Sequence, residues 1–132
     1  MHLERIDHVV FTVQDVDTTC DFYSRALGME IVTFGGGRKA LQFGQCKINL
    51  HQRGREFEPT AEHPAPGTQD ICLVTHTSMS KVVEHLDSVG VEPIEGPVPR
   101  TGALGPIESI YLRDPDGNLV EIACYADGNG TI

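Results

Sequence analysis

Three acidic or imidazole side chains lie inside stretches that otherwise have the composition of β-strands. Glu121 lies near the end of "YLRDPDGNLVEI", His8 lies in "RIDHVVFTV", and Asp70 is the second residue of "QDICLVT". In a concave, partly dry site, one imidazole and two carboxylates would repel and lose hydration, and a divalent cation removes most of that cost. An ion held in this way, with coordination positions left open, binds substrate oxygens and acts as a Lewis acid. The residue types therefore point to a metal site.

Taken singly, each of these residues has a structural explanation. A strand glutamate such as Glu121 is most often solvated or on a sheet edge. Asp70 can cap a turn after "PGTQ", and an isolated His8 is more often a core or surface histidine than a ligand. Their matched positions in an internal repeat favour the metal. The remaining histidines lack such support and are interpreted as surface residues: His2, His63, His76 and His85.

The first half of the chain predicts a strand, a helix and three further strands. Residues 5–13 are rich in β-formers, Asp15 is placed to cap a helix, and Gly28 is placed to end it. The β segments "MEIVTF", "KALQFG" and "KINLHQ" follow. "GGGR" joins the first two and lacks the lysine and hydroxyl residue of a phosphate loop, so it predicts a hairpin turn.

The second half predicts the same order of elements. After the strand that contains Asp70, Ser78 is placed to cap a helix, and three β segments follow around "PIEGPV", "IESIYLRD" and "NLVEIACY". Two ungapped correspondences support a repeat: His8 to Asp70 is 70 − 8 = 62, and Gly28 to Gly90 is 90 − 28 = 62. We therefore expect an α+β fold of two tandem βαβββ units that form a curled mixed sheet cup.

The expected organisation is one domain over residues 1–132. Repeat one covers about 4–52, a linker rich in proline and charge covers 53–67, and repeat two covers about 68–125. The tail 126–132 is expected to be loose.

A pseudo-two-fold relation between the units would bring the ligands together. His8 and Asp70 would face each other from the first strands, and Glu121 would join them from the last strand. Its counterpart in the first unit is Asn49 or, one pleat further, His51. Both are candidate substrate contacts.

Composition narrows the possible partners. With 19 acidic and 10 basic residues and a net charge of −9, the surface would repel nucleic acid and anionic lipid. The first residues lack the layout of a signal peptide, and no apolar run is long enough to cross a bilayer. The four cysteines form no CxxC pair, so free thiols in a reducing cytoplasm are expected.

Two long segments, "IDHVVFTVQDVDTTCDFYSRALGME" and "YLRDPDGNLVEI", are similar to signatures of the vicinal oxygen chelate superfamily. Its members include glyoxalase I, bleomycin-resistance proteins, fosfomycin-resistance thiol transferases and extradiol dioxygenases. The resemblance implies that His8 and Glu121 are metal ligands, and the likeness to fosfomycin enzymes implies that Ser109 and Tyr111 contact substrate. The third ligand is commonly histidine in this superfamily, whereas this chain offers Asp70.

A set of one imidazole and two carboxylates suits Mn²⁺, Mg²⁺, Ni²⁺ or Zn²⁺. The resemblance then implies a metal-dependent lyase, isomerase or thiol transferase acting on vicinal oxygens, with Glu121 or Asp70 as the base. Two alternatives stay open: an extradiol ring-cleaving dioxygenase, for which Fe²⁺ would need His51 as a second imidazole ligand, and a drug-binding protein of the bleomycin-resistance type. A homodimer is expected, because open sheets expose edges and short members of the superfamily pair.

Three arginines, Arg38, Arg100 and Arg113, are candidate anchors for an anionic substrate. Solvation at the surface explains each of them equally well.

Overall fold

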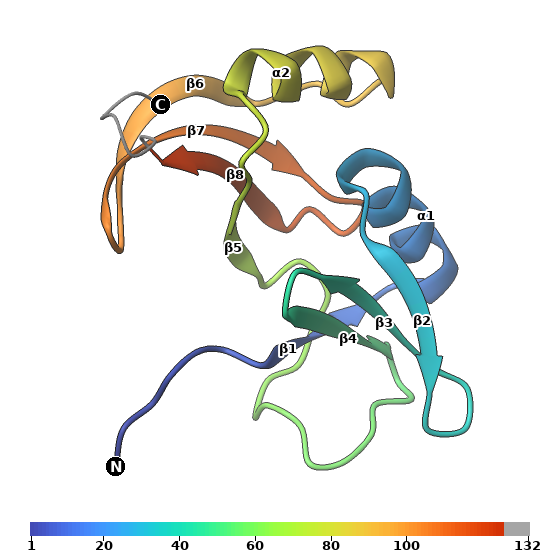
Figure 1. Cartoon of the computed structure of the whole chain (residues 1–132). Helices are drawn as coiled ribbons and strands as arrows, with labels where there is room; N and C mark the ends of the chain where they lie inside the picture. The colour runs from blue at the N-terminus through green and yellow to red at the C-terminus, as the bar shows by residue number, and fades with distance from the viewer. Residues whose placement is uncertain (126–132) are drawn as a thin grey trace. The chain divides into compact units, whose positions relative to one another are not determined.

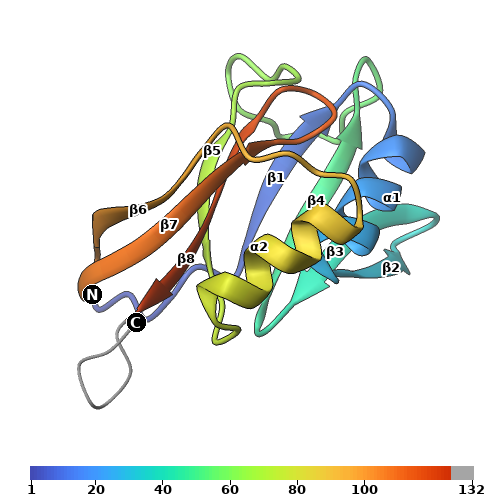
Figure 2. The ribbon, with the colours of Figure 1, turned by 90° about the horizontal axis from the view of Figure 1, so that it is seen from above.

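The computed structural model describes residues 1–125, which divide into two compact units (Figures 1 and 2). The first is Met1–Gln69, and the second begins at Asp70. Each contains one strand, one helix and three more strands, in that order. The α+β class and the two tandem βαβββ units predicted from the sequence are confirmed. The predicted tail, 126–132, lies outside the described residues.

The first unit is a four-stranded mixed sheet with one helix. Its elements are β1 (His8–Val13), α1 (Val16–Leu27), β2 (Glu30–Phe34), β3 (Arg38–Phe43) and β4 (Cys46–Gln52). The strand order is β1-β4-β3-β2, with β1 parallel to β4 and the other pairs antiparallel. The "GGGR" turn is the hairpin between β2 and β3, as predicted.

Helix α1 begins and ends at the predicted residues. The side chain of Asp15 accepts a hydrogen bond from the backbone N–H of Thr18 at 2.9 Å, and Gly28 ends the helix with φ of 69°. Such a φ favours glycine because it has no Cβ. The helix buries one side against β2, β3 and β4. The core consists of apolar residues from both layers: Phe11, Val13, Cys20, Tyr23, Ala26, Leu41, Ile48 and Leu50.

The second unit repeats this architecture. Its elements are β5 (Asp70–Val74), α2 (Met79–Ser88), β6 (Glu95–Gly102), β7 (Gly105–Arg113) and β8 (Leu119–Tyr125), in the sheet order β5-β8-β7-β6. Ser78 is at the N-cap position of α2 as predicted, but its side chain makes no capping hydrogen bond. The buried apolar residues of this unit include Met79, Val82, Leu86, Ile110, Leu112, Val120, Ile122 and Cys124.

Strand alternation leaves each sheet with one face whose side chains are not part of this apolar core. We call it the helix-free face. In the first unit it carries His8, Val10, Thr12, Arg38, Ala40, Lys47, Asn49 and His51, and in the second it carries Asp70, Cys72, Ser109, Tyr111, Arg113, Leu119, Glu121 and Ala123. All seven predicted site residues lie on these two faces. Neither described helix has the length and apolar character needed to cross a bilayer.

Candidate functional site

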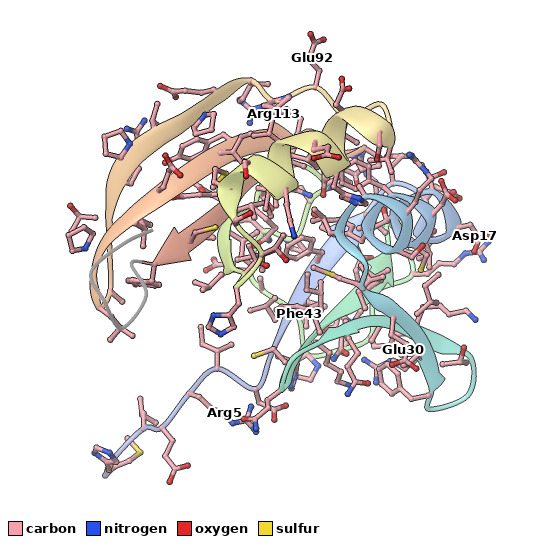
Figure 3. All side chains as sticks on the ribbon, turned by 45° about the horizontal axis from the view of Figure 1, so that its top comes forward. Arg5, Asp17, Glu30, Phe43, Glu92 and Arg113 are labelled. Carbon is pink, nitrogen blue, oxygen red and sulfur yellow. The ribbon has the colours of Figure 1, made fainter. Side chains whose placement is uncertain are left out.

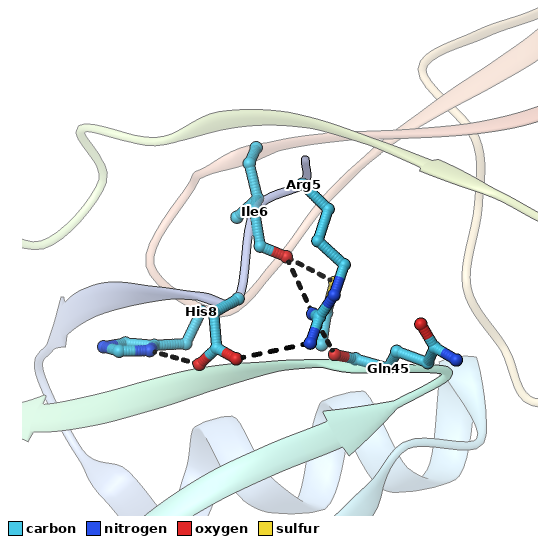
Figure 4. Close-up of polar contacts among 6 residues, drawn as sticks. Arg5, Ile6, His8 and Gln45 are labelled. Atoms are coloured by element: carbon cyan, nitrogen blue, oxygen red, sulfur yellow. Dashed lines mark hydrogen bonds and ion pairs between the residues drawn. The ribbon is translucent and has the colours of Figure 1, made fainter. Parts of the chain in front are cut away.

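His8 begins β1 and is oriented by its neighbour in the chain. Its Nδ1 lies 2.9 Å from a carboxylate oxygen of Asp7, and Arg5 lies 3.6 Å from the other oxygen (Figure 4). When Nδ1 donates to Asp7, the lone pair is on Nε2, which is the form of imidazole that binds metals. The hydrogen bond to His8, followed by the charge of Arg5, lowers the pKa of Asp7. Asp7 was not among the predicted site residues.

Asn49 and His51 are buried on β4, and each has one polar atom without a hydrogen-bond partner among residues 1–125. Asn49 is 6% exposed and His51 is 4% exposed, yet no described residue forms a hydrogen bond with Oδ1 of Asn49 or Nε2 of His51. Burial, followed by the charge of Arg38, lowers the pKa of His51, so its imidazole is neutral near pH 7. Unsatisfied buried polar atoms are costly, and a bound ligand is one way to satisfy them.

A cavity opens beside His51 within the first unit. Thr12 and His51 form its floor, and the segment between Pro59 and Gln69 forms its wall, including Thr60 and His63. The residues that line the cavity are mostly small, apolar or uncharged. The four histidines predicted to be surface residues are exposed, and His63 is the one among them that lines this cavity.

Glu121 is positioned by Ser109 on the second sheet. The fully buried hydroxyl of Ser109 donates to Oε2 of Glu121 at 2.5 Å. Gly96 lets strand β6 approach Ser109, because a Cβ at Gly96 would lie 2.5 Å from the Ser109 carbonyl oxygen. The Ser109 hydroxyl thus holds Oε2, and Glu121 also forms a side-chain hydrogen bond with Cys72.

Two more groups of β5 share this face with Glu121. Cys72 is the cross-strand partner of Glu121, and Asp70 lies two residues before it. Burial, the charge and hydrogen bond of Glu121, and the charge of Asp70 together raise the pKa of Cys72 to about 11. Cys72 is therefore a neutral thiol near pH 7, and the acidic character of this face comes from the two carboxylates. All four cysteines are free thiols.

The "DPDG" turn fixes which residues of β8 reach this face. Asp114 is buried, and its carboxylate accepts from the backbone N–H of Asp116 and of Asn118 and from the side-chain amide of Asn118, at 2.9, 3.0 and 2.8 Å. The turn sets the antiparallel register that pairs Tyr111 with Glu121.

The registers of the two units identify the counterpart of Glu121. Val10 pairs with Asn49 in the first unit, and Cys72, the residue 62 positions after Val10, pairs with Glu121 in the second. Of the two alternatives left open by the sequence, Asn49 is therefore the counterpart. Ala123 is the counterpart of His51.

The two arginines of the second unit have partners. Arg100 donates to the Tyr111 hydroxyl at 3.0 Å and lies 3.4 Å from Glu95, and Arg113 donates to the Gly117 carbonyl at 3.3 Å. Tyr111 is half-buried on the same face as Glu121.

The predicted ligand set is divided between the units, with His8 in the first and Asp70 and Glu121 in the second. Over residues 1–125, no group of three or more His, Cys, Asp or Glu side chains is gathered as a metal site. The convergence of these three residues stays a prediction. Their donor chemistry, one imidazole and two carboxylates, fits a divalent ion of intermediate to hard character.

Comparison with known proteins assigns the family. Residues 5–122 match the Glyoxalase/Bleomycin resistance protein/Dioxygenase superfamily. The chain belongs to this superfamily. It is 56% identical to the glyoxalase domain-containing protein RDO1 of Mycosarcoma maydis over 127 residues, 96% of this chain and 72% of that protein.

Two further relatives of this glyoxalase-superfamily chain are a virulence protein and an enzyme. It is 54% identical to virulence protein STM3117 of Salmonella typhimurium over 95% of this chain and 87% of that protein. The crystal structure of STM3117 superimposes with a TM-score of 0.93 over 95% of this chain and 99% of that one. Metallothiol transferase FosB of Staphylococcus epidermidis is 25% identical over 92% of this chain and 82% of that protein.

Proposed function

We propose that this glyoxalase-superfamily protein is a divalent-metal-dependent enzyme whose ligands are His8, Asp70 and Glu121. The observation that carries the proposal is the hydrogen bond from Nδ1 of His8 to Asp7. Histidines that bind metals almost always donate their other ring nitrogen to a carboxylate, a carbonyl or water, which fixes the tautomer. Mn²⁺, Ni²⁺, Zn²⁺ and Mg²⁺ suit the donor set, and Fe²⁺ would require His51 as a further imidazole.

The substrate in this proposal is a small molecule with two neighbouring oxygens. When bound, the ion supplies Lewis-acid stabilisation of negative charge on those oxygens. Glu121, which Ser109 holds by a hydrogen bond, or Asp70 would leave the ion during turnover and act as the base that takes a proton from the substrate and returns it. Tyr111, on the same face as Glu121, and Asn49 and His51 in the first unit supply polar contacts that orient the substrate.

The reaction belongs to the lyase and isomerase type of glyoxalases or to the thiol transferases. The superfamily match and the likeness to a relative named metallothiol transferase support this range of reactions. We also propose that the protein acts as a homodimer, which size-exclusion chromatography with light scattering tests.

The decisive experiment is metal binding by protein purified without chelator. Bound metal is measured by mass spectrometry, and Mn²⁺, Ni²⁺ and Zn²⁺ are titrated by calorimetry into the apoprotein. We expect stoichiometric binding that is lost in Glu121→Gln. Glu108→Gln is the matched control, because Glu108 lies on the neighbouring strand β7 but one residue out of phase with the helix-free face. Wild-type protein that binds no divalent ion, or Glu121→Gln that keeps full affinity, would contradict the proposal.

Three assays then separate the reactions. The methylglyoxal–glutathione hemithioacetal tests the lyase, and fosfomycin with a thiol tests the transferase. Cleavage of a catechol under air that His51→Ala abolishes would instead identify the dioxygenase. Tight binding of a drug such as bleomycin that survives EDTA, without turnover of any of these substrates, would identify the drug-binding alternative.

A further inference from the structure

Two cations on the helix-free face of the first unit, Arg38 and Lys47, form no ion pair within 4 Å in the described part of the chain. The guanidinium carbon of Arg38 lies 4.8 Å from the ring centroid of Phe34 and 4.4 Å from that of Phe57. The ammonium of Lys47 lies 3.8 Å from the Phe34 centroid. Among residues 1–125, neither cation has a side-chain hydrogen bond or an ion pair within 4 Å, and Nε of Arg38 is buried without an acceptor.

Neither cation has an ion pair among the described residues, although the chain as a whole is acidic. With a net charge of −9, carboxylates are plentiful, and Arg5, Arg25 and Arg100 each have one within 4 Å. The charge of Asp7 interacts with Lys47, but that carboxylate is already bonded to His8 and Arg5. A buried, charged N–H without an acceptor is costly, so the site favours an anion that would accept from it.

Ring contacts leave the hydrogen-bonding edge of Arg38 available. Aromatic rings stack on the face of a guanidinium, whereas its N–H donors lie in the plane and match the two oxygens of a carboxylate or phosphate. Phe34 and Phe57 therefore fix the side chain without using its donors. The ammonium of Lys47, held on the same Phe34 ring, adds a second charge.

The neighbours of Arg38 on this face include two neutral polar side chains, and the charge of Glu56 acts on one of them, His51. Ala40 pairs with Asn49, which places Arg38, two residues earlier on β3, beside His51 on β4, and the Phe57 ring touches both side chains. Oδ1 of Asn49 and Nε2 of His51 are the two unpartnered atoms described above. The face thus combines two cations, two phenyl rings and two unsatisfied neutral groups. The arginines of the second unit lack this character, because each already has a partner.

We propose that Arg38 and Lys47 bind an oxyanion group, a carboxylate or a phosphate, of a small molecule. That this molecule is the substrate rests on the proposed function; the anion site itself does not.

The test uses inorganic phosphate and acetate as probes, with EDTA present so that no metal contributes. Two-dimensional NMR follows the Arg38 side-chain Nε–H during each titration. We expect a saturable shift, and binding weakened roughly tenfold or more in Arg38→Met and in Lys47→Met. Lys39→Met is the matched control, since Lys39 lies next to Arg38 on the opposite face of β3 and is bonded to Thr33 at 2.7 Å.

The outcomes separate this site from the proposed metal site. Phosphate or acetate binding that persists in Glu121→Gln supports the anion site whether or not the wild type binds metal. No saturable shift with either probe, or equal weakening by Lys39→Met, would overturn it. If Arg38→Met fails to fold, Arg38→Lys replaces it, because lysine keeps the charge and loses the planar arrangement of donors. We expect Arg38→Lys to keep the fold, as measured by circular dichroism, and to bind phosphate and acetate more weakly than wild type.

Discussion

Removal of the Asp114 carboxylate should destabilise the second unit strongly. This side chain accepts three hydrogen bonds in the turn between β7 and β8, and two of them come from Asn118, which is fully buried. Asp114→Ala leaves the backbone N–H and side-chain amide of Asn118 without this acceptor in a site that water does not reach.

The size of the effect follows from these contacts. A hydrogen bond to a charged group contributes about 1.5–3 kcal/mol, and a buried donor left unsatisfied costs a similar amount. Because two buried donors share one carboxylate, the effects are not additive, and we expect a loss of about 3–4 kcal/mol in the free energy of unfolding. Asp114→Asn keeps the shape and one acceptor oxygen, so it should lose about 1–2 kcal/mol.

Urea unfolding followed by circular dichroism measures these differences. Glu92→Ala is the control, since Glu92 projects outward after α2 (Figure 3) and should change the stability by less than about 0.5 kcal/mol. A loss below about 1 kcal/mol in Asp114→Ala, or an equal loss in Asp114→Asn, would show that these hydrogen bonds do not hold the turn.

Three further predictions concern titration, reactivity and ligand affinity. Because folding lowers the pKa of His51 from 6.5, the unfolded chain binds more protons than the folded chain just below that pH. The stabilising effect of neutral His51 is present above pH 6.5 and is lost as the pH falls toward the folded-state pKa. Unfolding curves should therefore show less destabilisation by acid in His51→Gln than in wild type, and the same dependence of the unfolding free energy on pH in both would refute this. Burial and Glu121 raise the pKa of Cys72 from 9.0 to about 11, so the fraction of thiolate at pH 8 is about 100-fold smaller than in an unperturbed thiol, but each thiolate is more nucleophilic. Its alkylation by iodoacetamide at pH 8, followed by peptide mass spectrometry, should therefore be about 10-fold slower than that of an unperturbed thiol and faster in Glu121→Gln; alkylation at the rate of an unperturbed thiol would count against it. Asp7→Asn should weaken metal affinity, measured by calorimetry, about 10- to 100-fold. Asp21→Asn, which breaks an ion pair on the surface of α1, should leave the affinity unchanged, and equal affinities in the two variants would argue against an orienting role for Asp7.

The sequence predicted the fold well because its signals are local. Asp15 and Gly28 mark the ends of α1 through hydrogen bonding and φ preference, which depend on adjacent residues alone. Because the two halves of the chain match at an offset of 62 residues, the same order of elements was predicted for the second half. Ser78 shows the limit of such signals, since a residue of the right type occupies the cap position without making the bond.

The site was predicted less completely because it depends on neighbours across strands. Asp7 was missed because strict alternation would point it away from His8, whereas it precedes β1 and is free of that rule. The sequence alone could not distinguish Arg38 from Arg100. The structure shows that Arg100 lies beside the carboxylate of Glu95, whereas Arg38 lies on the ring of Phe57. The one sequence signal that could have identified Asp7 is its position directly before His8, the first residue of β1.

Duplication gives this architecture a simple route to chemical divergence. The paired positions Val10–Asn49 and Cys72–Glu121 share a backbone geometry while differing in charge. A glutamate introduced at Asn49 would take the register position that Glu121 occupies in the second unit, with valine as its neighbour instead of a thiol. Single substitutions at matched register positions can therefore give the two units different charges on the same face of a shared architecture.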